Sequence, residues 1–523
     1  MSGEIVIKRA LISVFKKDGV LELGRALANA GVEIISTGGT AKLLEGEGIA
    51  VTPVSKITEF PEMMDGRVKT LHPRIHGGLL MRRDVDSHRK AAAANGITPI
   101  DLVVVNLYPF GEVIAKPDCK DEDAIEMIDI GGPSMVRSAA KNHDFVAVVT
   151  DPVDYASLIA NAEKGQVTST PAERRQWAAK AFQTTAAYDA AIASWMLRDA
   201  EELPQRLQFV FDQRQSLRYG ENPHQRAALY TSDEPVQASV AWAHQHSGKA
   251  LSFNNYLDAA AALEAVRGLE GFGCTVIKHK NPCGAASRDD SQVEAYQAAY
   301  AGDPQSAFGG IVAFNQPLTP EVARLMAVKE KFYEVVVAPR YEGDALEILQ
   351  TGAKWGKNVR LLECDDLKPA FADRELELRW IRGGMLVQDP DLIGAVDFKV
   401  VSERQPDEAE MDDLRFAWEL VRNVTSNAIV YAKDRTLVAA GAGQMSRVDS
   451  VELAGRKGGD RCQGAVMASD AFFPFPDGIL AAKKAGIRAV VQPGGSIRDG
   501  KIIEACDAAG IAMVFTGRRH FRH

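Results

Sequence analysis

The sequence lacks the features that mark secreted, disulfide-rich and membrane-spanning proteins. Its six cysteines are scattered and never occur as C-x-x-C, so a disulfide framework is not expected and a reducing compartment fits better. The charged segment from Met1 to Arg9 contains no apolar core of a signal peptide. No apolar run approaches the roughly 20 residues needed to cross a bilayer. We therefore expect a cytoplasmic protein with no membrane partner.

An excess of positive charge is absent too. The formal net charge of −9 argues against a surface that coats nucleic acid, although local basic pockets for phosphates remain compatible with it. The chain has 523 residues, of which 46% are hydrophobic and 25% charged. This length predicts about three to four domains with sizeable cores.

Strand and helix signals alternate along the first part of the chain. The predicted strands cover residues 5–14, 32–36, 102–105 and 145–149, and the predicted helices cover residues 18–30, 121–129 and 134–141. This pattern predicts an α/β fold with a doubly wound, mostly parallel sheet. An alanine-rich helix over 170–200 follows, with Pro171 in its first turn.

The main domain boundary is predicted in the polar segment 201–208, which gives domains 1–200 and 201–523. Strand-like runs recur in the second domain around Val276, Ile311, Val335, Ile429, Val438 and Val490. No fixed-period repeat is evident. The length of more than 300 residues predicts two α/β lobes there.

The most informative motif is Lys278-His279, which follows the apolar run 274–277 and precedes Pro282 and Gly284. The pattern predicts a buried strand that ends at a turn, where side chains face a ligand. The ammonium lowers the pKa of its neighbour, so the imidazole suits the role of a neutral base. The alternative, a solvated surface pair, is the commoner fate of such dipeptides.

Several motifs of the first domain end strands or open helices. Thr37-Gly38-Gly39-Thr40 resembles a phosphate cradle at a helix N-terminus, with a plain tight turn as the alternative. The segment 67–73 places Arg67 and Lys69 on one side of an extended chain, unless it is only an exposed basic loop. The other candidates are Tyr108 at a strand end, Asp129 before a Gly-Gly turn, and Lys141, which could equally be a solvated helix-end cation.

The second domain carries further polar turns. Arg218 lies in a turn-rich segment and suits bidentate phosphate binding, although an exposed loop is the alternative. The segment 469–477 combines phenylalanines with two carboxylates, which suits either core packing or a slot for a flat heterocycle. The basic and aromatic end, residues 518–523, would ordinarily be a frayed tail.

Together these motifs resemble, in the same order over nearly the whole chain, the bifunctional purine-biosynthesis enzymes that combine phosphoribosylaminoimidazolecarboxamide formyltransferase with inosine-monophosphate cyclohydrolase. The signatures are S-T-G-G-T-A-K, G-R-V-K-T-L-H-P, N-L-Y-P-F, I-D-I-G-G, L-R-Y-G-E-N-P-H-Q, the K-H run, S-D-A-F-F-P-F and R-H-F-R-H. The resemblance implies a methylglyoxal-synthase-like cyclohydrolase domain and a transformylase domain of duplicated cytidine-deaminase-like lobes. It also implies a homodimer with transformylase sites across the subunit contact, and 10-formyltetrahydrofolate as co-substrate without a catalytic metal.

The resemblance assigns roles to individual residues. For formyl transfer it implies His279 as general base, Lys278 as stabiliser of developing charge and Asn427 as orienting amide. The expected substrate contacts of this site are Arg218, Tyr219, Arg447, Phe472, Asp477, Arg519, Phe521 and His523. For ring closure it implies Lys69, Tyr108, Asp129 and Lys141 as catalytic residues. The expected phosphate and ribose contacts there are Ser13, Lys17, Thr37, Gly39, Thr40, Arg67 and Thr70.

Two rival functions are weighed against this one. A zinc deaminase needs H-x-E and P-C-x-x-C. No histidine of this chain has glutamate two positions later, and Pro282-Cys283 lacks the second cysteine. A phosphate-sensing module would use the glycine cradle, but it has no evident use for Lys69, Tyr108 and Asp129 or for the long second domain.

Overall fold

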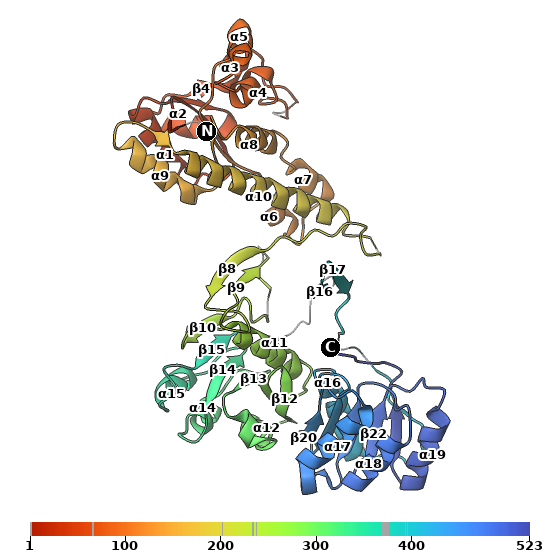
Figure 1. Cartoon of the computed structure of the whole chain (residues 1–523). Helices are drawn as coiled ribbons and strands as arrows, with labels where there is room; N and C mark the ends of the chain where they lie inside the picture. Colours follow the sequence, from red (N-terminus) through yellow and green to blue (C-terminus); the bar gives the residue numbers. More distant parts are fainter. Residues whose placement is uncertain are drawn as a thin grey trace. The chain divides into compact units, whose positions relative to one another are not determined.

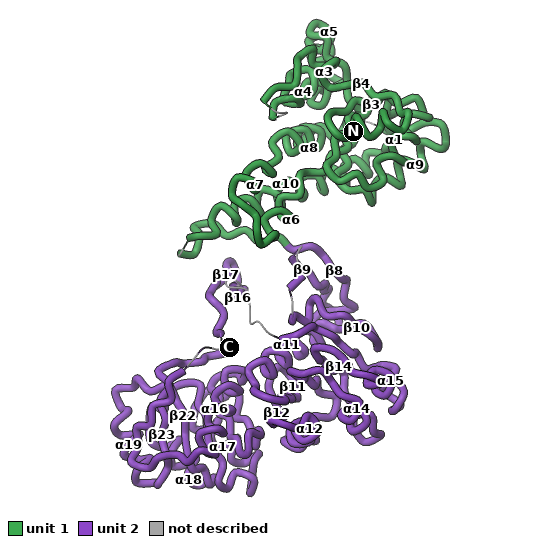
Figure 2. Tube along the Cα trace, turned by 180° about the vertical axis from the view of Figure 1, so that it is seen from behind, with its two compact units in different colours: residues 1–210 green, residues 211–523 purple. Residues whose placement is uncertain are grey.

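The protein is described here by a computed structural model. The described residues are 3–64, 67–200, 202–232, 235–236, 238–367, 376–392, 394 and 396–523. The chain forms two compact units, residues 1–210 and 211–523 (Figure 2). The division lies just beyond the predicted boundary segment 201–208, of which Glu201 is outside the described residues.

The first unit is built on a sheet of five strands in which all neighbours are parallel. In spatial order the strands are β4 (Thr52–Pro53), β3 (Glu33–Ser36), β2 (Arg9–Val14), β5 (Leu102–Asn106) and β6 (Ala147–Val149). The prediction of a parallel α/β sheet is confirmed. The predicted strand 5–14 is interrupted, because Ile5–Val6 forms β1 and pairs with β7 (Thr168–Ser169) in a separate ribbon.

Helices cover both faces of this sheet (Figure 1). Successive strand residues point to opposite faces. Ile12 therefore packs with α1 and α9, whereas Leu11 packs with α4, α8 and α10. The helices are α1 (Val20–Asn29), α2 (Gly38–Gly46), α3 (Val54–Thr58), α4 (Pro73–Leu80), α5 (Asp86–Ala94), α6 (Phe110–Ile114), α7 (Asp121–Glu126), α8 (Gly131–Lys141), α9 (Tyr155–Ala162) and α10 (Pro171–Met196). The helix predicted over 170–200 thus ends at Met196.

The second unit contains a mixed sheet of twelve strands. Its first half, in spatial order, is β10 (His244–Ser247), β15 (Arg360–Glu363), β14 (Tyr333–Ala338), β13 (Gly310–Phe314), β11 (Phe272–Lys278) and β12 (Asn281–Arg288). Its second half is β20 (Thr436–Gly441), β19 (Ile429–Lys433), β21 (Val466–Ser469), β22 (Ala489–Gln492), β23 (Ala512–Phe515) and β18 (Lys399–Val400). All six strand-like runs predicted from the sequence lie in these strands.

The two halves repeat one topology in opposite spatial order. Each has an antiparallel hairpin, an antiparallel neighbour, two parallel steps and an antiparallel edge strand. We call the half from β10 to β15 the first lobe and the half from β18 to β23 the second lobe. They join where β12 meets β20 at the pair Ala286 and Thr436. This repeated topology agrees with the two α/β lobes expected from the sequence.

Helices cover both faces of the twelve-stranded sheet as well. One face carries α11 (Phe253–Arg267) and α16 (Glu408–Val421), whose apolar residues share a single core with strands of both lobes. The other face has a separate core in each lobe. Its helices are α12 (Gln292–Ala301), α13 (Pro304–Ala307), α14 (Pro320–Met326), α15 (Ala345–Thr351), α17 (Arg447–Gly458), α18 (Asp477–Ala485) and α19 (Asp499–Ala509).

Two ribbons complete the unit: β8 (Asp212–Leu217) with β9 (Ala227–Thr231), and β16 (Glu377–Ile381) with β17 (Gly384–Gln388). Among the described residues, no helix is both long and apolar enough to cross a membrane.

Candidate functional sites

In the first unit, the predicted polar residues gather where strands of the parallel sheet end. Thr37 follows β3 and caps α2, and the backbone of Gly38 has a φ of 56°. The Lys69 ammonium lies 3.7 Å from the position that a Cβ would take on Gly38. The Thr70 hydroxyl would lie 2.8 Å from a Cβ on Gly131, the first residue of α8. The glycine turn, Lys69–Thr70 and the start of α8 therefore lie side by side.

Asp129 is the most buried carboxylate of this cluster. Its Oδ1 accepts the Gly132 N–H at 2.8 Å, and its own N–H donates to the Tyr188 hydroxyl at 2.9 Å. Burial raises the pKa of Asp129, while the N–H groups of Gly132 and Tyr108 and the charge of Lys69 oppose that shift. Burial, together with the Asp129 charge, also raises the pKa of Tyr108. An acid with a raised pKa beside a phenol and an ammonium can exchange protons with a ligand.

The side chains of Lys17 and Thr40 form hydrogen bonds with the end of β2. The Lys17 ammonium donates to the Val14 carbonyl and, at 2.9 Å, to the Thr40 hydroxyl. That hydroxyl also donates to the Val14 carbonyl at 2.9 Å. Burial lowers the pKa of Lys17. A ligand phosphate here would replace part of this internal network.

Three predicted residues of the first unit either lie away from the Asp129 cluster or already have an acidic partner. Lys141 is the exposed last residue of α8, whereas Asp129 precedes the first. At 1.5 Å per residue, the helix separates them by roughly 15 Å. Arg67 pairs with Glu126, and Lys69 has Glu62 at 3.7 Å. Lys141 is thus not brought to the Asp129 cluster.

In the second unit, Lys278 ends β11 and His279 begins a two-residue turn into β12. The Lys278 ammonium donates to the carbonyls of Phe308 at 3.2 Å and Gly309 at 3.0 Å, which leaves one of its three N–H groups for a ligand. His279 is exposed. The prediction of a buried strand that delivers these side chains to a turn is confirmed.

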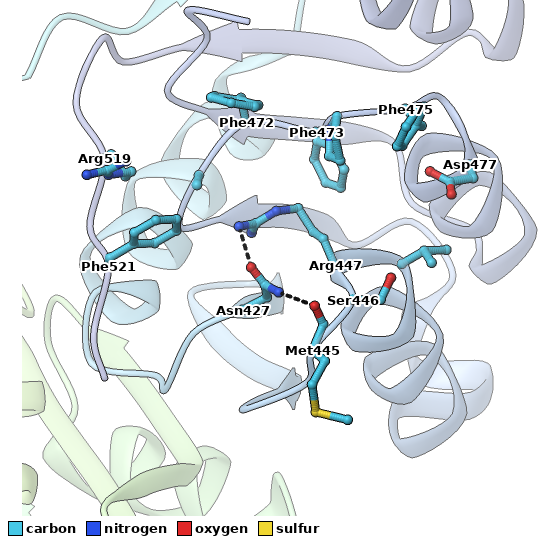
Figure 3. A pocket seen from close by; sticks show the side chains of 13 residues that line it. Asn427, Met445, Ser446, Arg447, Phe472, Phe473, Phe475, Asp477, Arg519 and Phe521 are labelled. Atoms are coloured by element: carbon cyan, nitrogen blue, oxygen red, sulfur yellow. Dashed lines mark hydrogen bonds between the residues drawn. The ribbon is translucent and has the colours of Figure 1, made fainter.

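A pocket of about 470 Å³ lies in the second lobe (Figure 3). Its lining includes six predicted residues from four segments: Asn427, Arg447, Phe472, Asp477, Arg519 and Phe521. A smaller pocket of about 270 Å³ is also lined by Asn427 and Phe521, and by His523. The predicted C-terminal residues therefore line a site and do not form a free tail.

A buried polar network fixes Asn427. Its side-chain oxygen accepts from Arg447 at 2.9 Å, and its NH₂ donates to the carbonyls of Gln444 at 3.0 Å and Met445 at 3.2 Å. Arg447 also donates to Ser469 at 2.8 Å and forms an ion pair with the fully buried Asp470. One lone pair of the Asn427 oxygen remains for a donor of a ligand.

The turn at His279 is linked to this network. The Asn281 side chain donates to the His279 carbonyl at 3.1 Å and accepts the Thr425 N–H at 3.0 Å. Thr425 lies two residues before Asn427. The predicted base and the predicted orienting amide therefore belong to one hydrogen-bonded region where the two lobes meet.

The phenylalanines of 469–477 serve both purposes considered for this segment, core packing and the lining of a slot. Phe473 is buried in the core of the second lobe. Phe472 is 39% exposed, Phe475 is 51% exposed, and both line the pocket. They provide apolar surface beside the Asp477 carboxylate, as a slot for a flat heterocycle requires.

Arg218 and Tyr219 are not brought to this pocket. They follow β8, are paired with each other through a 2.8 Å hydrogen bond, and do not line either of the two pockets described above. The sequence showed Asp470 only as one of the two carboxylates of the segment 469–477, with no role assigned to it. It did not single out Tyr188.

Within the described residues, no three His, Cys, Asp or Glu side chains are grouped so that they could hold a metal ion. Comparisons with known proteins give two family matches. Residues 139–457 match the model described as AICARFT/IMPCHase bienzyme, and residues 19–134 match the MGS-like domain. The solved structure titled "Crystal structure of ForH" is 33% identical and aligns with 36% of this chain and 99% of that chain, at a TM-score of 0.32.

Proposed function

Because the chain belongs to the AICARFT/IMPCHase bienzyme family, we propose that its two reactions take place at separate sites, one in each unit. The enzyme transfers a formyl group from formyltetrahydrofolate to 5-aminoimidazole-4-carboxamide ribonucleotide (AICAR) and then closes the ring of the formylated product to inosine monophosphate. These are the last two steps of purine synthesis. The first unit carries ring closure, and the second unit carries formyl transfer from the 10-formyl isomer.

The observation that supports the second site is the held amide of Asn427 beside the aromatic pocket. The free lone pair of Asn427 orients the amine of AICAR by accepting one of its N–H groups, while Phe472 and Asp477 border the pterin. Arg519 and Arg218 take the phosphate. Arg218 does not line the pocket of its own chain, so we assign it, with Tyr219, to the site of a second copy in a homodimer.

Formyl transfer begins when the amine nitrogen of AICAR attacks the formyl carbon. His279 takes the amine proton, and the remaining N–H of Lys278 stabilises the oxyanion of the tetrahedral intermediate. The bond from that carbon to N10 of the folate then breaks, and N10 leaves with the proton that His279 took from the amine, delivered with the help of Lys278. The step forms one C–N bond and breaks another, so it needs no oxidant or reductant.

Ring closure takes place in the Lys69–Tyr108–Asp129 cluster. The carboxamide nitrogen attacks the new formyl carbon within the same molecule, and water leaves, so positioning supplies much of the acceleration. Lys69 stabilises the oxyanion, and Tyr108 with Asp129 relays protons. Ser13, Thr37, Gly39 and the other residues near the strand ends hold the phosphate and ribose.

The deaminase-like origin of the lobes is also a proposal. It is supported by the repeated topology of the first and second lobes, which contribute the two halves of one sheet with helices on both faces. The residues of a deaminase zinc site are missing from the sequence, so this origin would concern the fold and not the chemistry.

Single-turnover formyl transfer with His279→Ala tests the second site. We expect a loss of about 100- to 10,000-fold, because a positioned base is removed. Asp434→Ala, in the matching turn of the second lobe, is the control and keeps the rate. Near-normal transfer by His279→Ala would reject the assignment. Cyclisation of the formylated nucleotide by Lys69→Ala and Tyr108→Phe tests the first site, and unchanged turnover in both would reject it.

A further inference from the structure

The turn that carries His279 has a structural twin in the second lobe. Lys278 pairs with Asn281 across the first turn, and Lys433 pairs with Thr436 across the second. The twin residues are 155 positions apart, and the same offset relates α11 to α16. The contacts of the two turns can therefore be compared residue by residue within one chain.

Both turns hold two residues with side chains in the left-handed region. The φ values are 51° and 64° at His279 and Lys280, and 52° and 45° at Asp434 and Arg435. Two-residue hairpin turns of this kind favour Asn and Gly, because a Cβ is strained there. Such a conformation persists only where surrounding contacts enforce it.

One contact that enforces it comes from a helical aspartate in each lobe. Asp258 of α11 accepts the Lys280 N–H at 2.8 Å. Asp413 of α16, again 155 positions later, accepts the N–H groups of Asp434 at 3.0 Å and Arg435 at 2.5 Å. The anchor is thus built into the repeated fold.

A second contact comes from the residue that closes each turn. Asn281 donates to the His279 carbonyl, and Thr436 donates to the Asp434 carbonyl, both at 3.1 Å. Each is also bonded to the opposite lobe: Asn281 by the Thr425 N–H at 3.0 Å, and Thr436 by the Arg288 guanidinium at 3.0 Å.

The two turns differ in the residues that contact them. In the second lobe, Arg435 is paired with Asp289 at 2.7 Å, and Arg288 donates to the Asp434 carbonyl at 2.9 Å, so that turn is closed by charged residues of the first lobe. In the first lobe, His279 is exposed and Asn281 connects its turn to the segment that leads to Asn427.

We propose that Asp258 and Asn281 are positioning residues for formyl transfer, which together hold the turn that presents His279 to the amine. This inference rests on the proposed role of His279. Asp258 acts on the turn through the Lys280 N–H, and Asn281 fixes the His279 carbonyl relative to the Asn427 segment. Neither residue touches the reacting atoms.

The test is steady-state formyl transfer by the full-length enzyme with Asp258→Ala, Asp258→Asn and Asp413→Ala. Asp258→Ala lowers kcat by about 10- to 100-fold with little change in KM, since the base is displaced and the pocket is not. Asp258→Asn restores most of the rate, because the amide oxygen accepts the same N–H. Asp413→Ala lowers thermal stability yet leaves kcat near the wild-type value.

Combination with His279→Ala separates positioning from a general structural role. Asp258→Ala and Asn281→Ala should each add little further loss when His279 is already absent, because both act through it. A full additional loss in that background overturns the proposal, as does an unchanged kcat for Asp258→Ala or an equal loss for Asp413→Ala. Normal transfer by His279→Ala alone would instead overturn the proposed base and this inference together.

Discussion

Arg447 and Asp470 form a buried ion pair that connects the start of α17 to the end of β21. The same guanidinium holds the Asn427 side chain, and the second oxygen of Asp470 accepts from Ser426. The Arg522 N–H in turn donates to the Ser426 hydroxyl at 3.0 Å. A single carboxylate therefore stabilises both the Asn427 side chain, through Arg447, and the C-terminal segment of the pocket.

Asp470→Asn should destabilise the second unit. Removal of one partner of a buried ion pair leaves an uncompensated charge, which costs about 3–5 kcal/mol of unfolding free energy. Denaturant unfolding of the full chain, with the two units followed as separate transitions, measures this loss. Formyl transfer should fall with it, while ring closure is retained. Asp289→Asn, which breaks the exposed pair with Arg435, is the matched control and should change the unfolding free energy little, because solvent screens an exposed ion pair. Equal losses in both variants would contradict the prediction.

Tyr188→Phe should weaken ring closure selectively. The Tyr188 hydroxyl accepts the Asp129 N–H and donates to the Met127 carbonyl at 2.6 Å, so it anchors the segment before α8 to α10. Two half-buried backbone groups lose their partner, at a cost of about 1–3 kcal/mol. Cyclisation of supplied formylated nucleotide and thermal unfolding measure the effects. Tyr155→Phe, on the opposite face of the sheet, is the control. Loss of formyl transfer in Tyr188→Phe would argue against a local effect.

Asp129→Asn should stabilise the first unit at neutral pH while it abolishes most ring closure. Burial raises the pKa of Asp129 in the folded protein. Between the unfolded and the folded pKa, the folded state binds more protons, so stability falls as the pH rises through this window and the penalty is complete above it. The amide carries no such penalty but cannot transfer the proton, which lowers the rate by about 100- to 10,000-fold.

Thermal unfolding of Asp129→Asn and wild type from pH 3 to pH 8 checks this prediction. The stability difference should grow as the pH rises and vanish at the acidic end of the series. Asp84→Asn should show the opposite pH dependence of stability, because the hydrogen bond from Arg82 lowers the pKa of the Asp84 carboxyl in the wild type. A constant difference across the pH range for Asp129→Asn would show that the carboxyl is not the titrating group.

The two activities should be separable by cutting the chain between Val210 and Phe211. Each unit has its own apolar cores and its own polar site, so each should remain folded. Fragment 1–210 should cyclise the formylated nucleotide without folate. Fragment 211–523 should transfer formyl only at concentrations where it dimerises, because Arg218 lies away from the pocket of its own chain. A folded fragment 1–210 that cannot cyclise would refute the division.

Local patterns in the sequence determined much of the fold. The apolar run 102–105 forms β5. The Thr-Gly-Gly turn after Ser36 opens α2, as the sequence predicted. The arrangement of Lys278-His279 at the end of a buried strand followed from a short apolar run and the Pro and Gly after it. These features depend on neighbours within a few positions, which a single sequence displays.

Only the tertiary structure decided which distant residues meet. Asp470 is an acidic residue, a type that is usually exposed, yet it is fully buried because strand order places it opposite Arg447 and Ser426. Lys141 shares a helix with the Asp129 segment, but helix length separates them. The roles of Asp258 and Asp413 became visible only when both were seen to accept backbone N–H groups of a turn. These contacts join residues 21 or 22 positions apart, so they depend on how each helix packs against its sheet and not on neighbours within a few positions.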